Sequence, residues 1–324
     1  AVIAARGISV LGVDIDPRVV ETVNNGCIHI VEPDLDMLVR AATQSGTLRA
    51  STSPEPSDVF IIAVPTPLRH RDGSDPAPCI DYVMDAARSI VSHVRPGNLV
   101  IVESTSPVGT TERVGQLLAE GGVDLSTIHL AYCPERVLPG RVLHELVAND
   151  RVIGGIDEVS SQLARDFYAL FVKGNLHTTN CRTAEMVKLT ENACRDINIA
   201  FANELSMICD DIGIDVYELI RLANHHPRIN ILMPGCGVGG HCIAVDPWFI
   251  VDMAPDKARM VRQARLTNDY KSQWVLDRIR AEYRALKMEN PVVAVLGLTF
   301  KPDIDDLRSS PALRIALDLV NERD

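Results

Sequence analysis

The chain has 324 residues, of which 46% are hydrophobic and 23% are charged, a composition typical of a globular protein with two domains and room for part of a third. Its formal net charge of −11 argues against a nucleic-acid surface, because phosphate backbones are bound by clustered Lys and Arg side chains. No apolar run approaches the roughly 18 residues that span a bilayer, so we expect neither membrane contact nor a signal peptide.

The cysteine pattern predicts neither a disulfide scaffold nor a metal site. The eight cysteines form no C-x-x-C pair, and the adjacent His241 and Cys242 lack the partner spacing of a zinc site. This pattern favours the reducing conditions of the cytoplasm.

The first half of the chain alternates short apolar segments with amphipathic ones. Residues 1–7 have the pattern of a helix end that stops at Gly7. The periodicity predicts strands at residues 8–13, 58–64, 99–103 and 128–132, helices at residues 17–25 and 80–94, and a further helix after Thr111 that ends at about Glu120. All-apolar strands that alternate with helices are typical of a parallel sheet covered on both faces, so we expect an α/β fold with a Rossmann-like domain.

Four polar residues follow these strands, namely Asp14, Thr66, Thr105 and Glu135. Ligands of open α/β sheets bind beyond the carboxyl ends of the strands, although a strand end can also simply be solvated. Asp14 stands where a dinucleotide fold has its ribose-binding acid, about 20 residues after the first glycine of the phosphate loop. Counting back places that loop before residue 1, so we expect the first strand and the glycine loop to be missing from this chain.

A long helix is predicted at residues 183–212 and a second helix at residues 216–223. Lys188, Asn192 and Arg195 share one face of the long helix, because they are spaced by four and then three residues. A solvated face is the commoner explanation, but the other faces of this helix are mostly apolar as well. Buried polar groups need partners, and a ligand is a candidate partner.

Residues 233–248 form a glycine-rich segment, in which Cys242 follows shortly after the last glycine. Glycine lets the backbone take φ > 0 and approach a ligand closely, so the segment predicts a binding loop. Asp246 follows four residues later, and a thiol on a pliant loop near a carboxylate indicates covalent catalysis. The segment alone slightly favours a tight turn with a buried cysteine, and the polar face of the long helix reverses that preference. The next segment, residues 246–251, turns apolar and can anchor the loop in the core.

The remaining pattern predicts a helix at residues 257–286, a break at Asn290-Pro291, a strand at 292–298, a loop at 299–303 and a helix at 311–321. One strand and one helix cannot bury their own apolar faces, so we expect the rest of a second Rossmann-like domain to be missing as well. The predicted division is a dinucleotide-binding domain at residues 1–180, a central helical domain at 181–288 and the start of another domain at 289–324.

Six windows, spread over nearly the whole chain, match one family in order: Val13-Asp-Ile-Asp16, Glu103-Ser-Thr-Ser-Pro-Val-Gly-Thr-Thr111, Cys133-Pro-Glu-Arg136, Ala184-Glu-Met-Val-Lys188 with Asn192 and Asn203-Glu204, Gly239-Gly-His-Cys-Ile-Ala-Val-Asp-Pro247, and Gly297-Leu-Thr-Phe-Lys-Pro-Asp303 with Arg308-Ser-Ser-Pro311. On these motifs the chain resembles the UDP-glucose/GDP-mannose dehydrogenase family. The segment around Cys242 is most similar to the branch that acts on UDP-N-acetyl-D-mannosamine, because Val245 stands where UDP-glucose and GDP-mannose enzymes have a lysine. Cys236 stands where the family more often has proline.

The resemblance implies an NAD-binding domain, a central catalytic and dimerisation domain and the start of a UDP-binding domain. It implies that the C6 alcohol of a UDP-sugar is oxidised twice, with two NAD⁺ consumed, to the uronic acid. UDP-N-acetyl-D-mannosamine is the expected substrate, with UDP-N-acetylglucosamine or UDP-glucose as alternatives. The expected partner is a second copy of the chain, paired through the long helix.

The catalytic residues that the resemblance implies are Cys242, Lys188, Asn192, Asp246, Glu135 and Thr105. Cys242 would form a thiohemiacetal with the aldehyde and then a thioester, while Lys188 would accept the proton of the alcohol. Lys188 and Asn192 would stabilise the oxyanion. Glu135 and Asp246 would position or deprotonate the hydrolytic water, which the threonine would hold.

The implied substrate contacts are Arg136, Val137, Lys188, Asn192, Arg195, His226, Arg228, Gly239, Phe300 and Lys301, whose cations would gather charge for the diphosphate. The implied NAD contacts are Asp14, Thr66, Thr105 and Arg308, and no metal is expected. Asp14 would take the ribose diol, which favours NAD over NADP because a 2′-phosphate would meet a carboxylate.

Three alternatives remain open. A β-hydroxyacid dehydrogenase has a similar sheet and a helix with Lys and Asn four apart, but its chemistry needs no cysteine, so Cys242 argues against it. A non-catalytic sugar-nucleotide-binding fragment is kept open by the two truncations, which also lead us to expect weak NAD⁺ binding by this chain. A thiol hydrolase is the third alternative, since His241 adjoins Cys242, but no group that would orient the histidine is identifiable.

Overall fold

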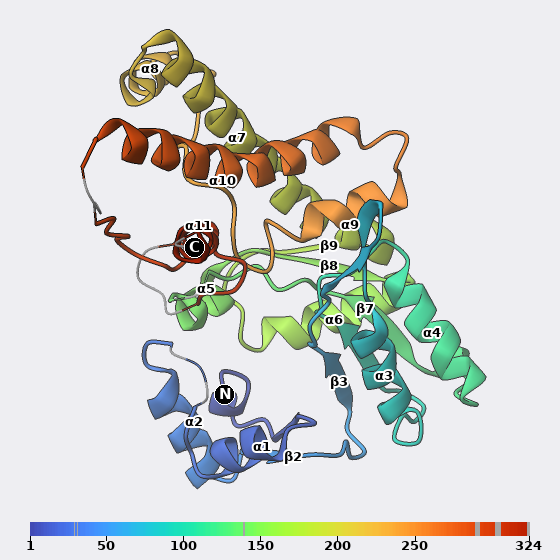
Figure 1. Cartoon of the computed structure of the whole chain (residues 1–324). Coiled ribbons are helices and arrows are strands. Elements are labelled where there is room, and N and C mark those ends of the chain that lie inside the picture. Colours follow the sequence, from blue (N-terminus) through green and yellow to red (C-terminus); the bar gives the residue numbers. More distant parts are fainter. Residues whose placement is uncertain (29, 31, 139, 289–291, 302–305, 323–324) are drawn as a thin grey trace. The chain divides into compact units, whose positions relative to one another are not determined.

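The computed structural model describes residues 1–28, 30, 32–138, 140–288, 292–301 and 306–322 of the chain (Figure 1). The chain divides into two compact units, residues 1–67 with 78–188 and residues 68–77 with 189–324, and helix α7 (Cys181–Ile212) runs from the first into the second. The predicted helix break at Asn290-Pro291 and the motif residues Pro302 and Asp303 lie outside the described residues.

The first unit is built on a five-stranded sheet in the order β3-β6-β7-β8-β9. Its strands are β3 (Val59–Ile62), β6 (Leu99–Val102), β7 (His129–Tyr132), β8 (Arg151–Gly155) and β9 (Leu176–Asn180). Strands β3, β6 and β7 are parallel, as expected, but β8 runs antiparallel to β7 and parallel to β9. The expected parallel sheet is confirmed for the three strands that the sequence predicts. Strand β8, which was not predicted, is the antiparallel exception, because an apolar run specifies which faces are buried and not the direction of the strand.

Helices cover both faces of this sheet. Val100 and Val102 of β6 pack into a cluster with α3 (Asp81–Ile90) and α4 (Thr110–Glu120). Leu99 and Ile101 of the same strand face the opposite cluster, which includes residues of α6 (Glu158–Ala169). Each such side chain stabilises the fold by about 1.5–3 kcal/mol on burial, which explains why this strand has an uninterrupted apolar sequence.

The N-terminal part of the first unit is a smaller layer with its own two-stranded parallel sheet. Its elements are η1 (Ala4–Arg6), β1 (Val10–Val13), α1 (Pro17–Asn24), α2 (Leu35–Gln44) and β2 (Leu48–Ser51). Gly7 ends η1 with φ 80°, so the predicted helix end is confirmed as a 3₁₀ turn. The Asp16 side chain accepts from the Arg18 amide and caps α1. The short elements η2 (Leu125–Thr127) and α5 (Val142–Ala148) complete the unit.

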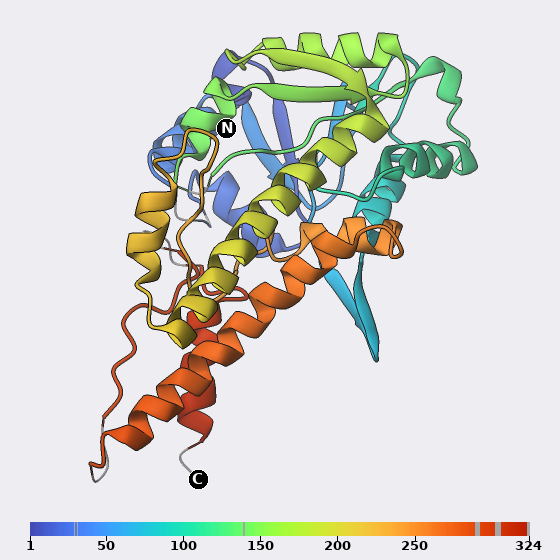
Figure 2. The ribbon, with the colours of Figure 1, turned by 90° about the horizontal axis from the view of Figure 1, so that it is seen from above.

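The second unit is helical, with α7 and α10 side by side in the same direction (Figure 2). Its other elements are the hairpin β4 (Leu68–Arg71) and β5 (Ser74–Pro78), and the helices α8 (Val216–Ala223), α9 (Asp246–Met253), α10 (Arg259–Ala285) and α11 (Pro311–Asn321). An ion pair of 3.1 Å between Asp210 and Arg278 joins α7 to α10. Arg280 and Glu322 pair between α10 and the end of α11.

The predicted strand at residues 292–298 is wrong. These residues take no regular structure, and Val292 and Leu296 are 92% and 94% exposed. A strand is stabilised by pairing, and no strand among the described residues pairs with this segment. In the described part of the chain, no helix is both long and apolar enough to cross a membrane.

Candidate functional site

The carboxyl ends of β1, β3 and β6 carry Asp14, Thr66 and Thr105, as the sequence predicts. Asp14 is exposed, and its Oδ1 accepts a hydrogen bond of 2.9 Å from the Asp16 amide. Thr66 and Thr105 are half-buried in neighbouring loops. The buried Ser104 joins these loops, because its Oγ accepts from the Val64 amide at 2.8 Å. The three predicted side chains therefore lie in loops that follow strands of the same unit.

Glu135 lies just beyond β7, and its pKa is raised by burial, while the Val137 amide and then the Lys188 ammonium act to lower it. Lys188 is buried on α7 with 8% exposure, close enough to Glu135 to influence its charge. A carboxyl group with a raised pKa is a better general base near neutral pH than an ordinary one. The structure thus brings together two predicted catalytic residues from far-apart segments.

Glu185, one turn before Lys188, fixes the start of α7. Its carboxylate is fully buried and accepts from the Gly109 amide at 2.6 Å, the Thr111 amide at 2.8 Å and the Thr111 hydroxyl at 2.7 Å. These donors form the N-terminus of α4, where a carboxylate is also favoured by the helix dipole. Sequence reasoning missed this role, although an acidic residue within a buried stripe of α7 was its signal.

A second buried cluster supports the ends of β6 and β7. The Tyr168 hydroxyl donates to Glu103 Oε1 at 2.6 Å, and Arg151 Nη1 lies 3.5 Å from the same oxygen. Cys133 is fully buried beside them, and burial raises the pKa of its thiol to about 12. This cysteine of the Cys-Pro-Glu-Arg motif is therefore protonated and inert near neutral pH.

The glycine-rich segment places Cys242 four residues before α9 begins at Asp246. The Cys242 carbonyl accepts from the Asp246 amide at 2.8 Å and from the Val245 amide at 3.0 Å. Asp246 is only 2% exposed, and its Oδ2 accepts from Asn192 Nδ2 at 2.5 Å. Cys242 is half-buried. Three predicted catalytic residues are therefore adjacent: Asn192 from α7, Asp246 from the start of α9 and Cys242 from the turn before it.

The predicted anchor of this segment is confirmed. Residues 246–251 of α9 are all buried, including Trp248 and Phe249. The burial of these side chains holds the turn that carries Cys242 against the helical unit.

The other side of the glycine segment contacts the chain around Phe300. A Cβ on Gly239 would lie 2.6 Å from Phe300 Cβ and 2.7 Å from the Ser309 carbonyl oxygen, so only glycine fits there. The Gly240 amide donates to the Arg308 carbonyl at 3.3 Å. The structure thereby groups the predicted residues Gly239, Phe300 and Arg308.

Arg308 places positive charge near the candidate nucleophile. Its side chain donates to Asp306 at 2.6 Å, and this hydrogen bond lowers the pKa of Asp306 to about 2. The same guanidinium interacts electrostatically with Cys242. A neighbouring cation favours the thiolate, which is the nucleophilic form of cysteine. Sequence reasoning gave Arg308 a cofactor role and did not foresee this one.

The remaining predicted binding residues lie at the surface or in half-buried loops. Arg136 Nη1 donates to the Asp150 carbonyl at 3.0 Å. Arg195, His226 and Arg228 are exposed, and Lys301 is half-buried in the loop that follows Phe300. Among the described residues, no group of three His, Cys, Asp or Glu side chains could hold a metal ion.

Three models of one family match the chain in order. They are the NAD binding domain of the UDP-glucose/GDP-mannose dehydrogenase family over residues 1–172, its central domain over residues 182–270 and its UDP binding domain over residues 294–323.

Individual proteins match over nearly the whole chain. An NDP-N-acetyl-D-galactosaminuronic acid dehydrogenase from Ralstonia nicotianae is 56% identical, and the match covers 99% of this chain and 77% of that protein. A UDP-N-acetyl-D-mannosamine dehydrogenase from Campylobacter jejuni is 53% identical, with coverage of 99% and 80%. The solved structure of a UDP-D-ManNAc dehydrogenase from Pyrococcus horikoshii superimposes with a TM-score of 0.91 at 40% identity, covering 99% of this chain and 77% of that one.

Proposed function

Because the chain belongs to the UDP-glucose/GDP-mannose dehydrogenase family of NAD-dependent oxidoreductases, we propose that it oxidises the C6 alcohol of UDP-N-acetyl-D-mannosamine to the uronic acid in two steps. The observation that carries the proposal is the adjacency of Cys242, Asn192 and Asp246 at the start of α9. Because of this family membership, we prefer this function over the two alternatives of a β-hydroxyacid dehydrogenase and a thiol hydrolase.

NAD, when bound, supplies the hydride acceptor for both oxidations. Asp14 fits the ribose-binding role, because its exposed carboxylate is held at the end of β1 by the Asp16 amide. A carboxylate in that position can accept hydrogen bonds from ribose hydroxyls and would repel a 2′-phosphate. On the resemblance we assign Thr66, Thr105 and Arg308 to the same cofactor.

The first oxidation needs a base. The C6 carbon loses a hydride while its hydroxyl proton passes to Lys188 Nζ, which leaves the aldehyde. Burial of Lys188 within α7 supports this role, because an amine removed from water is held in one position. Asn192 lies one turn further along the same helix.

The second oxidation needs a nucleophile. The Cys242 thiolate adds to the aldehyde carbon, and the resulting thiohemiacetal loses a hydride to become a thioester. Asn192 has two amide donors, one of which is bonded to Asp246, so the other can stabilise the oxyanion, a contact typically worth about 3–4 kcal/mol. Water then cleaves the thioester, releasing the acid and the thiol, with Glu135 or Asp246 as the base and Thr105 holding the water.

The proposed substrate contacts are those that the resemblance implies, namely Arg136, Val137, Lys188, Asn192, Arg195, His226, Arg228, Gly239, Phe300 and Lys301.

We also propose that two copies of the chain pair through α7, where Phe201, Ile208 and Ile212 are 52%, 48% and 62% exposed. Light scattering that shows a monomer at micromolar concentration would contradict this pairing. The domain boundaries at residues 180 and 288 remain predictions.

The proposal is tested by counting NADH per sugar on the full-length protein with four UDP-sugars, those of N-acetylmannosamine, N-acetylgalactosamine, N-acetylglucosamine and glucose. Two NADH on the first sugar alone support the proposed substrate. Two NADH on the N-acetylgalactosamine sugar instead would move the substrate toward that named for the Ralstonia relative. One NADH per sugar, with release of the aldehyde, would contradict the four-electron reaction.

A further inference from the structure

The segment that delivers Cys242 has little regular structure of its own. Residues 231–235 and 237–239 belong to no helix or strand, and Gly237 and Gly240 have φ values of 137° and 83°. Glycine loses more conformational freedom on folding than any other residue, so such a segment is ordered only by contacts from outside.

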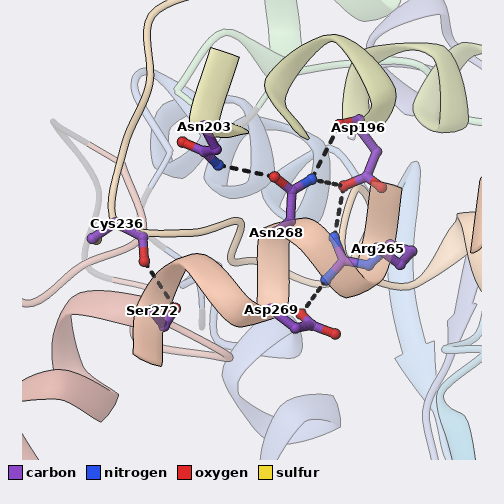
Figure 3. A network of polar contacts seen from close by, with 7 residues as sticks. All are labelled: Asp196, Asn203, Cys236, Arg265, Asn268, Asp269 and Ser272. Carbon is purple, nitrogen blue, oxygen red and sulfur yellow. Dashed lines mark hydrogen bonds and ion pairs between the residues drawn. The ribbon is translucent and has the colours of Figure 1, made fainter. Parts of the chain in front are cut away.

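Two side chains from neighbouring helices supply such contacts at consecutive residues. Asn203 of α7 accepts from the Gly235 amide through its Oδ1 at 2.9 Å. Ser272 of α10 donates its Oγ proton to the Cys236 carbonyl at 2.8 Å (Figure 3). The loop backbone is therefore held as a donor by one helix and as an acceptor by the other.

A buried network fixes the orientation of Asn203. Its Nδ2 donates to Asn268 Oδ1 at 2.9 Å, and Asn268 Nδ2 in turn donates to Asp196 Oδ1 at 2.8 Å (Figure 3). Arg265 completes the network by donating to the same Asp196 oxygen at 2.6 Å. Because an amide nitrogen only donates and an amide oxygen only accepts, each amide has one arrangement that satisfies all these bonds. The oxygen of Asn203 is thus left facing the loop.

Close packing holds the same stretch of loop. A Cβ on Gly237 would lie 2.5 Å from Ser272 Oγ, so the loop backbone lies directly against this hydroxyl. On its other side, a Cβ on Gly239 would meet Pro311 Cδ at 2.8 Å. Downstream, the Cys242 carbonyl accepts from the start of α9. The backbone is therefore restrained on both sides of the thiol. Upstream, the Gly240 amide bond to the Arg308 carbonyl is the nearest restraint, and the Asn203 and Ser272 bonds hold the start of the same glycine run.

We propose that Asn203 and Ser272 are positioning residues for Cys242, which they serve by holding the Gly235–Cys236 backbone in the conformation that presents the thiol. The inference rests on the proposed cysteine chemistry. Loss of either of these two hydrogen bonds lowers the fraction of molecules in which the Cys242 sulfur can reach the aldehyde carbon. The alcohol step uses Lys188 and not the thiol, so the loss falls on the aldehyde-to-acid step.

The test is the partition between released aldehyde and acid in the full-length Ser272→Ala variant. Aldehyde is trapped with an aminooxy reagent, and NADH and acid are counted on the same samples. We expect acid formation to fall by about tenfold to a hundredfold, as for small misplacements of reacting groups, while the first oxidation changes by less than about threefold. Asn203→Asp, which keeps the acceptor for Gly235 but loses the donor to Asn268, should shift the partition in the same direction.

Ser206→Ala is the matched control for Ser272→Ala. Ser206 also bridges α7 and α10, accepting from Lys271 at 2.7 Å, and its hydroxyl donates to the Asn203 carbonyl at 2.6 Å and not to the glycine loop. A merely structural role would slow both oxidations together, so a partition in Ser272→Ala equal to that of Ser206→Ala overturns the inference. The Cys242→Ala variant distinguishes failure of the proposed cysteine chemistry from failure of the positioning role. If it still makes acid, the proposed chemistry fails; if it makes none while Ser272→Ala partitions normally, only the positioning role fails.

Discussion

Two loops of this chain place a cysteine shortly before a carboxyl group. Cys133 precedes Glu135 by two residues at the end of β7, and Cys242 precedes Asp246 by four residues at the start of α9. Cys133 is fully buried, and that burial raises the pKa of its thiol to about 12. Cys242 is half-buried and interacts electrostatically with the Arg308 guanidinium. The same residue types therefore give an inert thiol in one loop and a candidate nucleophile in the other.

The burial of the two carboxyl groups is the reverse of that of the two thiols. Glu135 is half-buried and its pKa is raised above the ordinary value, chiefly by burial. Asp246 is 2% exposed and is held by Asn192 at 2.5 Å. Both thiols have a cation nearby, since Arg151 acts to lower the pKa of Cys133 and Arg308 interacts with Cys242. Solvent access is therefore the clearer difference between the two cysteines.

The largest effect is expected when the candidate nucleophile Cys242 is replaced. Cys242→Ser keeps the size of the side chain but replaces the thiol by a hydroxyl, which is not ionised near neutral pH. Acid formation should fall by several powers of ten, roughly as in other nucleophile knockouts, while slow oxidation of the alcohol persists. Any adduct would be an oxygen ester, and mass spectrometry of the quenched variant should find it on residue 242.

Cys133→Ala is the matched change in the other loop. Because the Cys133 thiol is buried and protonated, its removal should leave the partition between aldehyde and acid unchanged, even if the protein loses stability. Near-normal acid release by Cys242→Ser, or loss of acid in a folded Cys133→Ala protein, would reverse our assignment of the two cysteines.

A smaller effect is expected when the nearby charge is removed. Arg308→Ala takes away the cation that interacts with Cys242, so iodoacetamide should alkylate Cys242 more slowly, by roughly threefold to tenfold at neutral pH. The rate is measured without NAD by site-resolved mass spectrometry, so that a cofactor role of Arg308 cannot contribute. Arg308→Lys keeps the charge and should stay closer to the wild type. Equal rates in all three proteins would show that this charge does not activate the thiol.

The smallest effect concerns stability and pH at Glu135. Its raised pKa means that the folded protein keeps a proton that the unfolded chain has already lost. The wild type should therefore lose stability relative to Glu135→Gln as pH rises from the ordinary value of 4.5 to the raised value, with a constant difference above it. Denaturant unfolding of both proteins over this range measures the difference. A difference that shrinks as pH rises would mean that the pKa is lowered.

Local sequence signals were sufficient for several elements. Helices α8 and α11 begin and end where the pattern predicts, because Asp215 and Ser310 cap their first turns. Strand β6 was recognisable from four consecutive apolar residues. A similar apolar run at residues 292–298 led to the wrong prediction of a strand. A strand also needs a partner strand to pair with, and the local sequence does not show whether one is present. Strands β2, β4, β5, β8 and β9 and helices α2, α5, α6 and α9 were not predicted.

For the candidate site, the motifs were enough to single out Cys242, Asn192 and Asp246, since glycines, a thiol and a polar helix face can be read from order and spacing. Only the tertiary structure showed that Asn203 and Ser272 hold the glycine loop. Only the tertiary structure likewise showed that Cys133 is fully buried and that burial raises the pKa of its thiol. The physical reason is that burial, hydrogen-bond direction and the distance to a charge depend on residues brought together from far along the chain, whereas spacing along one helix or loop is a property of the sequence itself.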